Sequence, residues 1–352
     1  MRRLKVLFLP WWSRNPYQQM LTKHLEQVGV EVENFNHNSI IFLTAQVMRW
    51  KPDIIHFHTL YPFFLSSNRF TFLCKFFTFF SQVVILKLMG VKMIWTVHDL
   101  KNHENIQVQS EQIFNIFFAR FADAIITHCE IAKREVVKLF HFKNDFKIFV
   151  IPHANYIGCY ENTINRWEAQ TKLGITDAKL ILLFLGLIRT YKGVPELIDA
   201  FKQLESEGVY LVIAGKAPNE LAEKIRQTII GHDNIKFIPG FVADHQIQVY
   251  MNACDVVVLP YRDILTSGSL ILAMSFGRAC IAPRKGCIKE VLDDEGGFLY
   301  EPEDEEGLKS AIATALQKKS ELVRMGEHNR QMIKEWNWER IAQMTFKVYQ
   351  RC

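Results

Sequence analysis

Short apolar segments alternate with segments of helical periodicity along almost the whole chain. Because strands buried on both faces and joined by helices form parallel sheets, this alternation predicts an α/β fold with doubly wound sheets. The length of 352 residues suits two such domains better than one. The apolar segments predict strands at residues 6–9, 53–58, 91–97, 124–127, 147–151, 180–186, 210–214, 235–239, 256–260 and 279–282.

The alternation relaxes in the polar stretch at residues 156–174. We place the domain boundary in this stretch, with a first Rossmann-like domain over residues 1–160 and a second over residues 161–330. Residues 329–350 form a further helical stretch that carries Trp336 and Trp338.

Charge and cysteine usage limit the class of partner and the compartment. Residues 1–150 carry 18 Lys+Arg against 11 Asp+Glu, whereas the remainder carries 24 against 26. A basic first half suits an anionic partner such as a lipid surface, and no nucleic-acid motif is present. The seven cysteines are odd in number and form no C-x-x-C pair, which argues against a disulfide framework and predicts a cytoplasmic protein.

A phenylalanine-rich segment follows the second predicted strand. Nine of the 27 Phe residues lie between Phe57 and Phe80. Lys75, Gln82 and Lys87 interrupt the apolar run, so we do not expect it to span a membrane. Two interpretations stay open: a buried core helix, or a helix that contacts lipid at the cytoplasmic face of the membrane.

Two segments of the second half predict anion binding. The sequence LLFLGLIRTYKG is a buried strand that ends near Gly186, followed by Arg189 and Lys192 before a helix at residues 194–204. Strand ends and helix starts bind phosphate because free backbone N–H groups and the helix dipole attract anions. A second such start, rich in hydroxyl groups, precedes the helix at residues 270–276 and contains Thr266, Ser267, Gly268 and Ser269.

Titratable and aromatic side chains follow the strands of the first half. His98, Asp99 and His103 come just after one predicted strand and are candidates for acid–base chemistry. His56 and His58 lie on one face of another strand, but no third ligand is evident, so we predict no metal site. Other residues at strand ends can bind an acceptor sugar or lipid, or can simply pack: Trp11, Trp12, Asn15, Tyr17, His128 and His153.

A series of motifs resembles the GT-B glycosyltransferases, above all the GT4-like family of group 1 glycosyltransferases. LGLIRTYKG resembles the family's G-R-x-x-x-x-K-G loop, and VYLVIAG resembles its L-x-I-x-G strand. NIKFIPGFV, QVYMNACDVVVLPY, LILAMSFGRACIAP and NWERIAQ resemble later family motifs in the right order. In the first half, PDIIHFHTL and WTVHDLKNHE resemble the acceptor domain in outline.

The chain departs from the family at its Glu-x₇-Glu pair, where it carries Ile264 and Leu272. In the family these glutamates contact the donor sugar and the ribose, which Ile and Leu cannot do. The resemblance therefore implies that the Thr266–Ser269 segment binds the diphosphate. It also implies that Glu290 takes over the ribose contact, and that Gly240 and Phe241 lie beside the nucleotide.

The resemblance implies an enzyme, a hexosyltransferase with two domains facing across a cleft. It would move a sugar from a GDP- or UDP-linked donor to a sugar hydroxyl, without a metal or other cofactor, because no Asp-x-Asp motif is present. The helix at 331–352 would cross back onto the first domain. The phenylalanine-rich helix and the basic first half together suggest a polyprenyl-diphosphate-linked acceptor in bacterial exopolysaccharide biosynthesis, at the inner membrane surface.

Two chemical outcomes and two further functions stay open. If the enzyme inverts the anomeric centre, Asp99 is the first candidate base, followed by His98 and His103. If it retains the configuration, the leaving phosphate can take the proton, and His98 would position the donor sugar. The further functions are a nucleotide-sugar-binding protein without transferase activity and a sugar-nucleotide epimerase.

Overall fold

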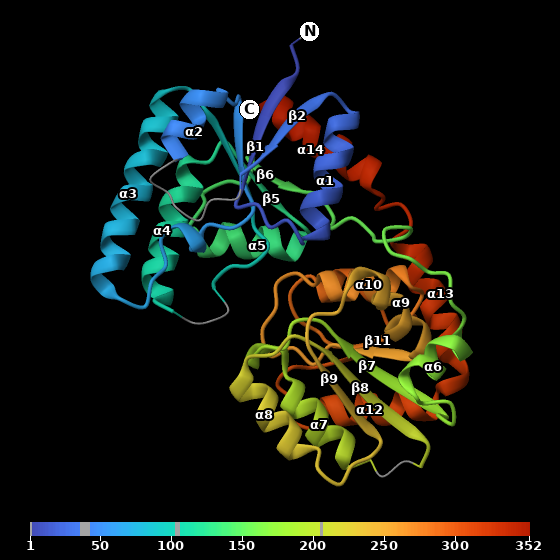
Figure 1. Ribbon diagram of the computed structural model, residues 1–352. Helices are drawn as coiled ribbons and strands as arrows, with labels where there is room; N and C mark the ends of the chain where they lie inside the picture. Colours follow the sequence, from blue (N-terminus) through green and yellow to red (C-terminus); the bar gives the residue numbers. More distant parts are fainter. Residues whose placement is uncertain (1, 36–42, 103–105, 205–206) are drawn as a thin grey trace. The chain divides into compact units, whose positions relative to one another are not determined.

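The computed structural model describes residues 2–35, 43–102, 106–204 and 207–352. The chain forms two compact units (Figure 1). The first contains residues 1–154 and 338–352, and the second contains residues 155–337. The division between the units therefore lies six residues before the expected boundary at residue 160. The last helix of the chain belongs to the first unit.

The first unit is built on a parallel sheet with the strand order β2-β1-β3-β4-β5-β6. Two of its strands, β3 and β5, are buried along their whole length, because helices cover both faces (Figure 1). The strands are β1 (Leu4–Leu9), β2 (Val30–Asn34), β3 (Ile54–Phe57), β4 (Lys92–Thr96), β5 (Ala124–Thr127) and β6 (Ile148–Val150). The helices are α1 (Pro16–Gln27), α2 (Leu43–Trp50), α3 (Arg69–Leu88), α4 (Val108–Phe121), α5 (Glu130–Leu139) and α14 (Trp338–Arg351).

The second unit repeats this design with the strand order β12-β11-β10-β7-β8-β9. All six residues of β7 are buried, as the apolar run LILLFL predicts. The strands are β7 (Leu180–Leu185), β8 (Val209–Gly215), β9 (Ile235–Pro239), β10 (Val256–Val258), β11 (Ala279–Pro283) and β12 (Gly297–Tyr300). The helices are α6 (Arg166–Leu173), α7 (Val194–Lys202), α8 (Asn219–Thr228), α9 (Asp244–Ala253), α10 (Gly268–Ser275), α11 (Ile288–Val291), α12 (Gly307–Gln317) and α13 (Leu322–Met332).

The predicted doubly wound α/β fold is confirmed, and every predicted strand is present. Two details differ. The polar stretch at 156–174 contains the helix α6, which begins with a capping box between Asn165 and Glu168. The helical stretch at 329–350 is divided between α13 and α14, and the break lies between Met332 and Trp338.

The phenylalanine-rich segment begins with a short 3-10 turn (Tyr61–Phe63) and continues as α3. Among the described residues, α3 is the one helix long and apolar enough to cross a membrane, and 28% of its most apolar window is buried. Its inner face packs against α4, with Phe79 stacked on Phe114 at a centroid distance of 5.1 Å. Gln82 is buried too, and its Oε1 accepts hydrogen bonds from the backbone N–H and the hydroxyl of Thr44.

Candidate functional site

A small polar cradle lies at the end of β7 in the second unit. Gly186, the residue after this strand, has a φ of 144°, which few residues other than glycine adopt. A Cβ at this position would lie 3.3 Å from the Ser269 hydroxyl and 3.7 Å from the Lys192 ammonium. Gly186 therefore leaves a space that one cation and one hydroxyl group line.

Tyr261 links the two sides of this cradle. The Lys192 ammonium lies 5.4 Å from the centre of the Tyr261 ring, within cation–π range. The Tyr261 hydroxyl accepts a hydrogen bond from the Ser267 hydroxyl at 3.3 Å. Tyr261 itself is 3% exposed, so this buried ring fixes both polar groups relative to each other.

The N-terminus of α10 forms the other wall. Ser267 is its N-cap, and the Ser267 hydroxyl accepts a hydrogen bond from the backbone N–H of Leu270 at 3.1 Å. The backbone N–H groups of Gly268 and Ser269 occupy the first helical turn, where the dipole favours an anion. Lys192 and this helix start together make a site suited to a diphosphate.

The loop that carries Lys192 is held by close backbone packing. Gly193 precedes α7, and a Cβ there would lie 1.9 Å from the carbonyl oxygen of Pro260. The backbone N–H of Arg262 donates to the carbonyl of Tyr191 at 2.8 Å. These contacts place Lys192 beside the residues that follow β10, which the sequence alone could not show.

The other residues predicted for the donor lie around the same end of the sheet. Arg189 begins the turn Thr190–Lys192, and its guanidinium donates to the carbonyl of Ile188 at 3.2 Å. Thr266 is half-buried and directly precedes the N-cap of α10. Gly240 follows β9 and donates its N–H to the carbonyl of Gly215, and Phe241 is exposed.

Glu290 lies on the short helix α11. The loop before this helix is hydrogen-bonded to and packed against the segment before α10. The backbone N–H of Cys287 donates to the carbonyl of Leu265 at 2.8 Å. A Cβ on Gly286 would lie 2.5 Å from the carbonyl oxygen of Ile264. This close packing needs glycine at 286 and holds the loop before Glu290 against the segment that leads to Ser267.

The two positions of the missing glutamate pair are apolar and largely packed. Ile264 is 8% exposed, and Leu272 is half-buried within α10. Neither side chain offers a hydrogen-bonding atom to a sugar or a ribose. The polar groups that remain near this helix start are the hydroxyl groups and backbone N–H groups described above.

In the first unit, four consecutive strands are each followed by a histidine. His58, His98, His128 and His153 follow β3, β4, β5 and β6. Since the carboxyl ends of parallel strands lie at one edge of a sheet, these side chains converge there. The buried Tyr17 ring, from the first turn of α1, lies among them at centroid distances of 4.9 to 6.0 Å.

Hydrogen bonds to carbonyl groups assign the protons in this cluster. His128 Nδ1 lies 2.9 Å from the carbonyl oxygen of Ile151, which can only accept, so this nitrogen carries a proton. In the neutral ring Nε2 is then an acceptor. His98 Nδ1 lies 3.2 Å from this Nε2 and donates to it, which leaves the Nε2 of His98 as its unprotonated nitrogen. His153 Nδ1 donates to the carbonyl of Ala154 in the same way.

Desolvation keeps these imidazoles neutral, although His98 and His153 are only half-buried. Desolvation, aided by neighbouring histidines, holds the pKa of His98 and of His58 well below the usual value. The same causes lower the pKa of His153 to about 3. Desolvation lowers the pKa of His128 to about 4, although its hydrogen bond to Ile151 and the charge of Asp99 act in the opposite direction. Neutral rings can orient hydroxyl groups and accept protons.

The two histidines of the His-x-His strand have different surroundings. His56 Nδ1 lies 2.6 Å from the Tyr349 hydroxyl, and Nε2 lies 2.7 Å from the Thr96 hydroxyl, so both nitrogens are paired. His58 is 2% exposed, and both of its ring nitrogens lack a hydrogen-bond partner among the residues that the structure describes. The Asn115 Oδ1 is buried as well and has no partner within the described part of the chain.

A cavity of about 30 Å³ lies between these unpaired groups. Its lining includes His58, Asn115, His98, Asp99 and Trp95. This volume admits about one water molecule or one hydroxyl group. Buried polar atoms without partners are costly, so the cavity is suited to a small group that both donates and accepts hydrogen bonds.

The structure gives different roles to the remaining predicted residues of this unit. Asn15 caps α1, and its Oδ1 accepts from the backbone N–H of Tyr17 at 3.0 Å. The backbone N–H of Trp12 donates to Gln18, and the Trp12 ring is 37% exposed. Trp11 is half-buried and pairs its backbone N–H with the carbonyl of Phe35. His103 lies outside the described residues.

Sequence reasoning missed several members of both clusters. Gly186, Tyr261 and Asn115 were not predicted, and His58 was considered only as a metal ligand. Gly186 lies inside the motif that predicted Arg189 and Lys192, so its position at a strand end was a usable signal. Among the described residues, no group of three or more His, Cys, Asp or Glu side chains is arranged to hold a metal ion.

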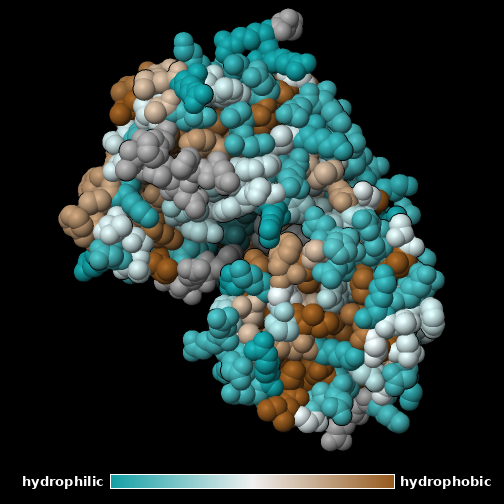
Figure 2. Space-filling model, in the orientation of Figure 1, coloured by the Kyte–Doolittle hydropathy of each residue, from teal (hydrophilic) through white to brown (hydrophobic). Residues whose placement is uncertain are grey.

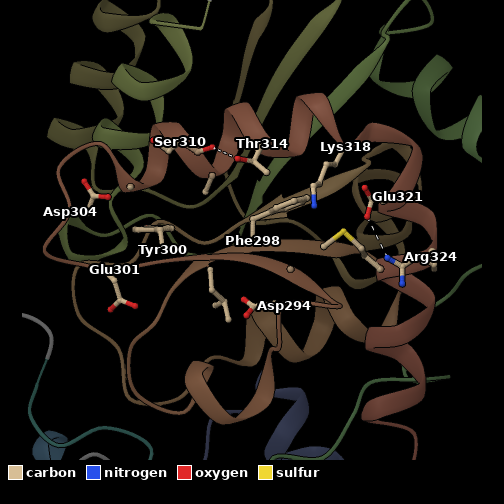
Figure 3. Close-up of a pocket in the computed structure, with 15 residues that line it drawn as sticks. Asp294, Phe298, Tyr300, Glu301, Asp304, Ser310, Thr314, Lys318, Glu321 and Arg324 are labelled. Carbon is tan, nitrogen blue, oxygen red and sulfur yellow. Dashed lines mark hydrogen bonds and ion pairs between the residues drawn. The ribbon is translucent and has the colours of Figure 1, made fainter.

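The second unit also has a larger cavity, of about 440 Å³, between β12, α12 and α13 (Figure 3). Its labelled charged groups are mostly acidic, with four carboxylates against Lys318 and Arg324. Arg324 is paired with Glu321 at 3.4 Å. An anionic nucleotide would be repelled here, so the chemistry favours the cradle at Gly186.

Comparisons with known proteins agree with this geometry. Residues 165–332 match the family described as glycosyl transferases group 1, and residues 29–154 match glycosyltransferase family 4. The GDP-mannose:glycolipid 4-beta-D-mannosyltransferase of Xanthomonas campestris pv. campestris is 30% identical over 173 residues, 48% of each chain. The lipopolysaccharide 1,2-N-acetylglucosaminetransferase of Salmonella typhimurium is 29% identical over 187 residues, covering 49% of this chain and 48% of that one. The chain spans about half the length of these curated relatives.

Solved structures share the fold over the full chain. Sucrose-phosphate synthase from Thermosynechococcus elongatus superposes with a TM-score of 0.81 at 16% identity, covering 99% of both chains. HepE of Anabaena in complex with UDP superposes with a TM-score of 0.77 at 17% identity, covering 99% of this chain and 100% of that one. At such identities the likeness shows the two-domain fold alone.

Proposed function

The chain belongs to the group 1 glycosyltransferases and has their GT-B fold, and we propose that it transfers a hexosyl group from a nucleoside diphosphate sugar to a hydroxyl group of a lipid-linked glycan. The observation that carries this proposal is the cradle at Gly186. It brings the ammonium of Lys192, the hydroxyl of Ser269 and the start of α10 to one strand end.

The proposed chemistry follows from where charge develops. When the sugar leaves, the diphosphate gains negative charge, and groups already aimed at that position stabilise the transition state. Lys192 and the α10 start would supply this stabilisation, with Arg189 on the same loop as a second cation. We propose that these groups suffice without a metal ion.

The acceptor hydroxyl must lose a proton, and the first unit offers two groups for this. His98 is half-buried and neutral, and its Nε2 is unprotonated at neutral pH. Asp99 lines the same small cavity as His98. In an inverting reaction, Asp99 or His98 would act as the base. In a retaining reaction, the leaving phosphate would take the proton and His98 would orient a sugar hydroxyl.

The donor, acceptor and location are proposed from the relatives and from the sequence. One relative is named for GDP-mannose and a glycolipid, and fold neighbours were solved with UDP and UDP-glucose. We therefore propose a GDP- or UDP-linked hexose and a glycolipid acceptor of the polyprenyl-diphosphate class. The reaction would take place at the cytoplasmic face of a bacterial membrane, as a step in exopolysaccharide assembly.

One observation favours a second function, the binding of a sugar nucleotide without transfer. Ile264 and Leu272 occupy the two positions where the family has glutamate, and both are apolar. A protein of this kind would bind the nucleotide through the cradle but would release none of it as free diphosphate. An epimerase, in contrast, would release nucleotide without any acceptor.

A thermal-shift panel of UDP, GDP, ADP and their sugar conjugates tests the donor site. A ligand that binds the native protein raises its melting temperature. We expect a shift with one nucleotide family, lost in Arg189→Ala/Lys192→Ala. The matched control, Lys172→Ala/Lys224→Ala, removes two exposed cations from α6 and α8 and should keep the shift.

The panel and a second assay separate the alternatives. If no nucleotide shifts wild type, the donor-site assignment is wrong. If one does, release of nucleoside diphosphate is measured with and without a glycolipid extract as acceptor. Release that needs the extract supports transfer. Release without it supports the epimerase, and binding with no release in either case supports the binding protein.

A further inference from the structure

Helix α3 has two apolar faces, and one of them is uncovered. The inner face contains Phe72, Phe79, Val83 and Leu86, each at most 5% exposed. The opposite face contains Phe70, Leu73, Phe77 and Leu88, which are 77%, 49%, 63% and 83% exposed. The narrow polar stripe of Thr71, Lys75, Thr78 and Gln82 runs between the two faces, as helical spacing requires.

Helix α4 extends this uncovered surface. Ile113 and Phe117 are 53% and 48% exposed, and the Phe117 ring contacts Phe80 of α3 at a centroid distance of 6.2 Å. We call the six side chains of Phe70, Leu73, Phe77, Leu88, Ile113 and Phe117 the outer face. Figure 2 shows tan and brown residues along the side of the first unit where Figure 1 places α3.

The exposed charges of α3 and α4 are cations, and Asp123, which follows α4, is paired with Lys87 and Lys92. The sequence has no Asp or Glu between Asp53 and Asp99. Arg69 and Lys75 of α3 and Arg120 of α4 are exposed. The one acidic residue of α4, Glu111, is 3% exposed and accepts hydrogen bonds from Asn102. An apolar surface bordered by exposed cations is complementary to anionic lipid head groups.

We propose that the outer face is a membrane-docking surface that inserts its aromatic and aliphatic side chains into the interface of an anionic bilayer. Arg69, Lys75 and Arg120 then contact lipid head groups, with their aliphatic stems along the apolar surface. Helix α3 lies in the interface and does not cross the bilayer, because its inner face is part of the core. Phe57 of β3 contacts Phe79 at 6.0 Å, and extracting α3 would expose this cluster to water.

The position of α3 in the sheet relates this surface to the reaction. Helix α3 connects β3 to β4, so its first turn lies near the carboxyl ends of these strands. His58 and His98 follow the same two strand ends. Docking through Phe70 and its neighbours would therefore place the edge that carries the histidine cluster near the head groups. This last step rests on the proposed function, whereas the docking itself does not.

Vesicle flotation with the full chain tests the proposal, with no nucleotide present. The vesicles are phosphatidylcholine alone, and phosphatidylcholine with about one-third phosphatidylglycerol at low salt. We expect wild type to float with the anionic vesicles. The triple variant Phe70→Ser/Phe77→Ser/Leu88→Ser should bind at least about tenfold more weakly, because it removes three inserted apolar side chains. These positions are solvent-exposed, so the variant should fold.

Two further variants control for general effects. Trp167→Ser/Ile230→Ser/Val323→Ser removes three apolar side chains of the second unit that are 67%, 77% and 72% exposed, and it should float as wild type does. Arg69→Gln/Lys75→Gln should lose the preference for anionic vesicles and the weakening by added salt.

Three outcomes would overturn the proposal. In the first, wild type binds neither kind of vesicle. In the second, the outer-face triple variant and the control triple variant of the second unit weaken binding equally. In the third, sedimentation shows a wild-type dimer that the outer-face triple dissociates while vesicle binding is absent, which would identify a second copy as the occupant. Because the assay needs no sugar nucleotide, its failure leaves the donor site to be judged by the thermal-shift panel.

Discussion

The Nε2 of His128 lies 3.2 Å from the Nδ1 of His98, and this contact determines which nitrogen of His98 carries the proton. The chain of bonds begins at the carbonyl of Ile151, which fixes the His128 tautomer. We predict that long-range ¹H–¹⁵N NMR at neutral pH finds His98 protonated on Nδ1. His98→Ala should lower transfer by at least about 100-fold, the range for loss of an acid–base group.

His128→Phe separates positioning from chemistry. It removes the acceptor for His98 but leaves the His98 ring in place, so the NMR tautomer signal should change while nucleotide binding stays the same. The loss of turnover should be smaller than for His98→Ala. If His98 keeps its tautomer in this variant, the contact does not control it.

Gly186→Ala should prevent nucleotide binding. The added Cβ enters the space between Ser269 and Lys192, and alanine at a φ of 144° is strained by about 1–3 kcal/mol. The control Gly231→Ala lies in the same unit at a φ of 80° with nothing within 4 Å of its Cβ. Both variants should lose stability in urea unfolding, but only Gly186→Ala should lose the thermal shift with nucleotide.

His56→Leu and His58→Leu should have opposite effects on stability. His56→Leu leaves the buried hydroxyls of Tyr349 and Thr96 without a partner and should cost about 2–4 kcal/mol. His58→Leu replaces a side chain that has two unpaired ring nitrogens with one that has no polar atom. The free energy of unfolding should therefore stay the same or rise by up to about 2 kcal/mol. Urea unfolding of both variants checks this. A large loss with His58→Leu would show that the cavity holds a structural water.

The second measurement on His58→Leu is activity. If the cavity beside His58 receives a hydroxyl group of the substrate, the variant should transfer more slowly despite its stability. Equal turnover in wild type and variant would limit the cavity to a packing defect.

Acid should destabilise the first unit. In the native state burial lowers the pKa of His128 from 6.5 to about 4, so between these values the unfolded chain binds more protons. The free energy of unfolding is therefore highest above pH 6.5. It falls as the pH falls toward 4, by up to about 3 kcal/mol for this residue. Urea unfolding at several pH values measures the slope of the free energy of unfolding against pH. His153→Leu should flatten it, whereas the exposed His245→Gln should not.

The features that could be predicted from the sequence were those set by local pattern. The convergence of His98, His128 and His153 follows from parallel strands, whose carboxyl ends share one edge. The two strands that were missed, β2 and β12, each lie at one edge of their sheet. Each has a single fully buried residue; β2 alternates valine with glutamate, and β12 is only four residues long. Helix α6 was missed for a related reason, since Ala169 and Gln170 are its only buried residues.

The features that could not be predicted depend on tertiary packing. Tyr17 lies at the centre of the histidines because α1 packs over the sheet edge, and no spacing in the sequence indicates this. Asn115 lies in the middle of α4 and meets His58 only through the fold. Tyr349 is 293 residues from His56 along the chain, yet their side chains are hydrogen-bonded.

The return of α14 to the first unit has a consequence for how the chain is synthesised. Helix α14 supplies Tyr349 to His56 and Trp338 to Tyr17, so the first unit lacks these partners until residues 338–351 have left the ribosome. The second unit, which is continuous in sequence, can fold earlier. Released chains truncated just before Trp338 should therefore protect the second unit from protease while the first remains open to cleavage, although its own residues are made first.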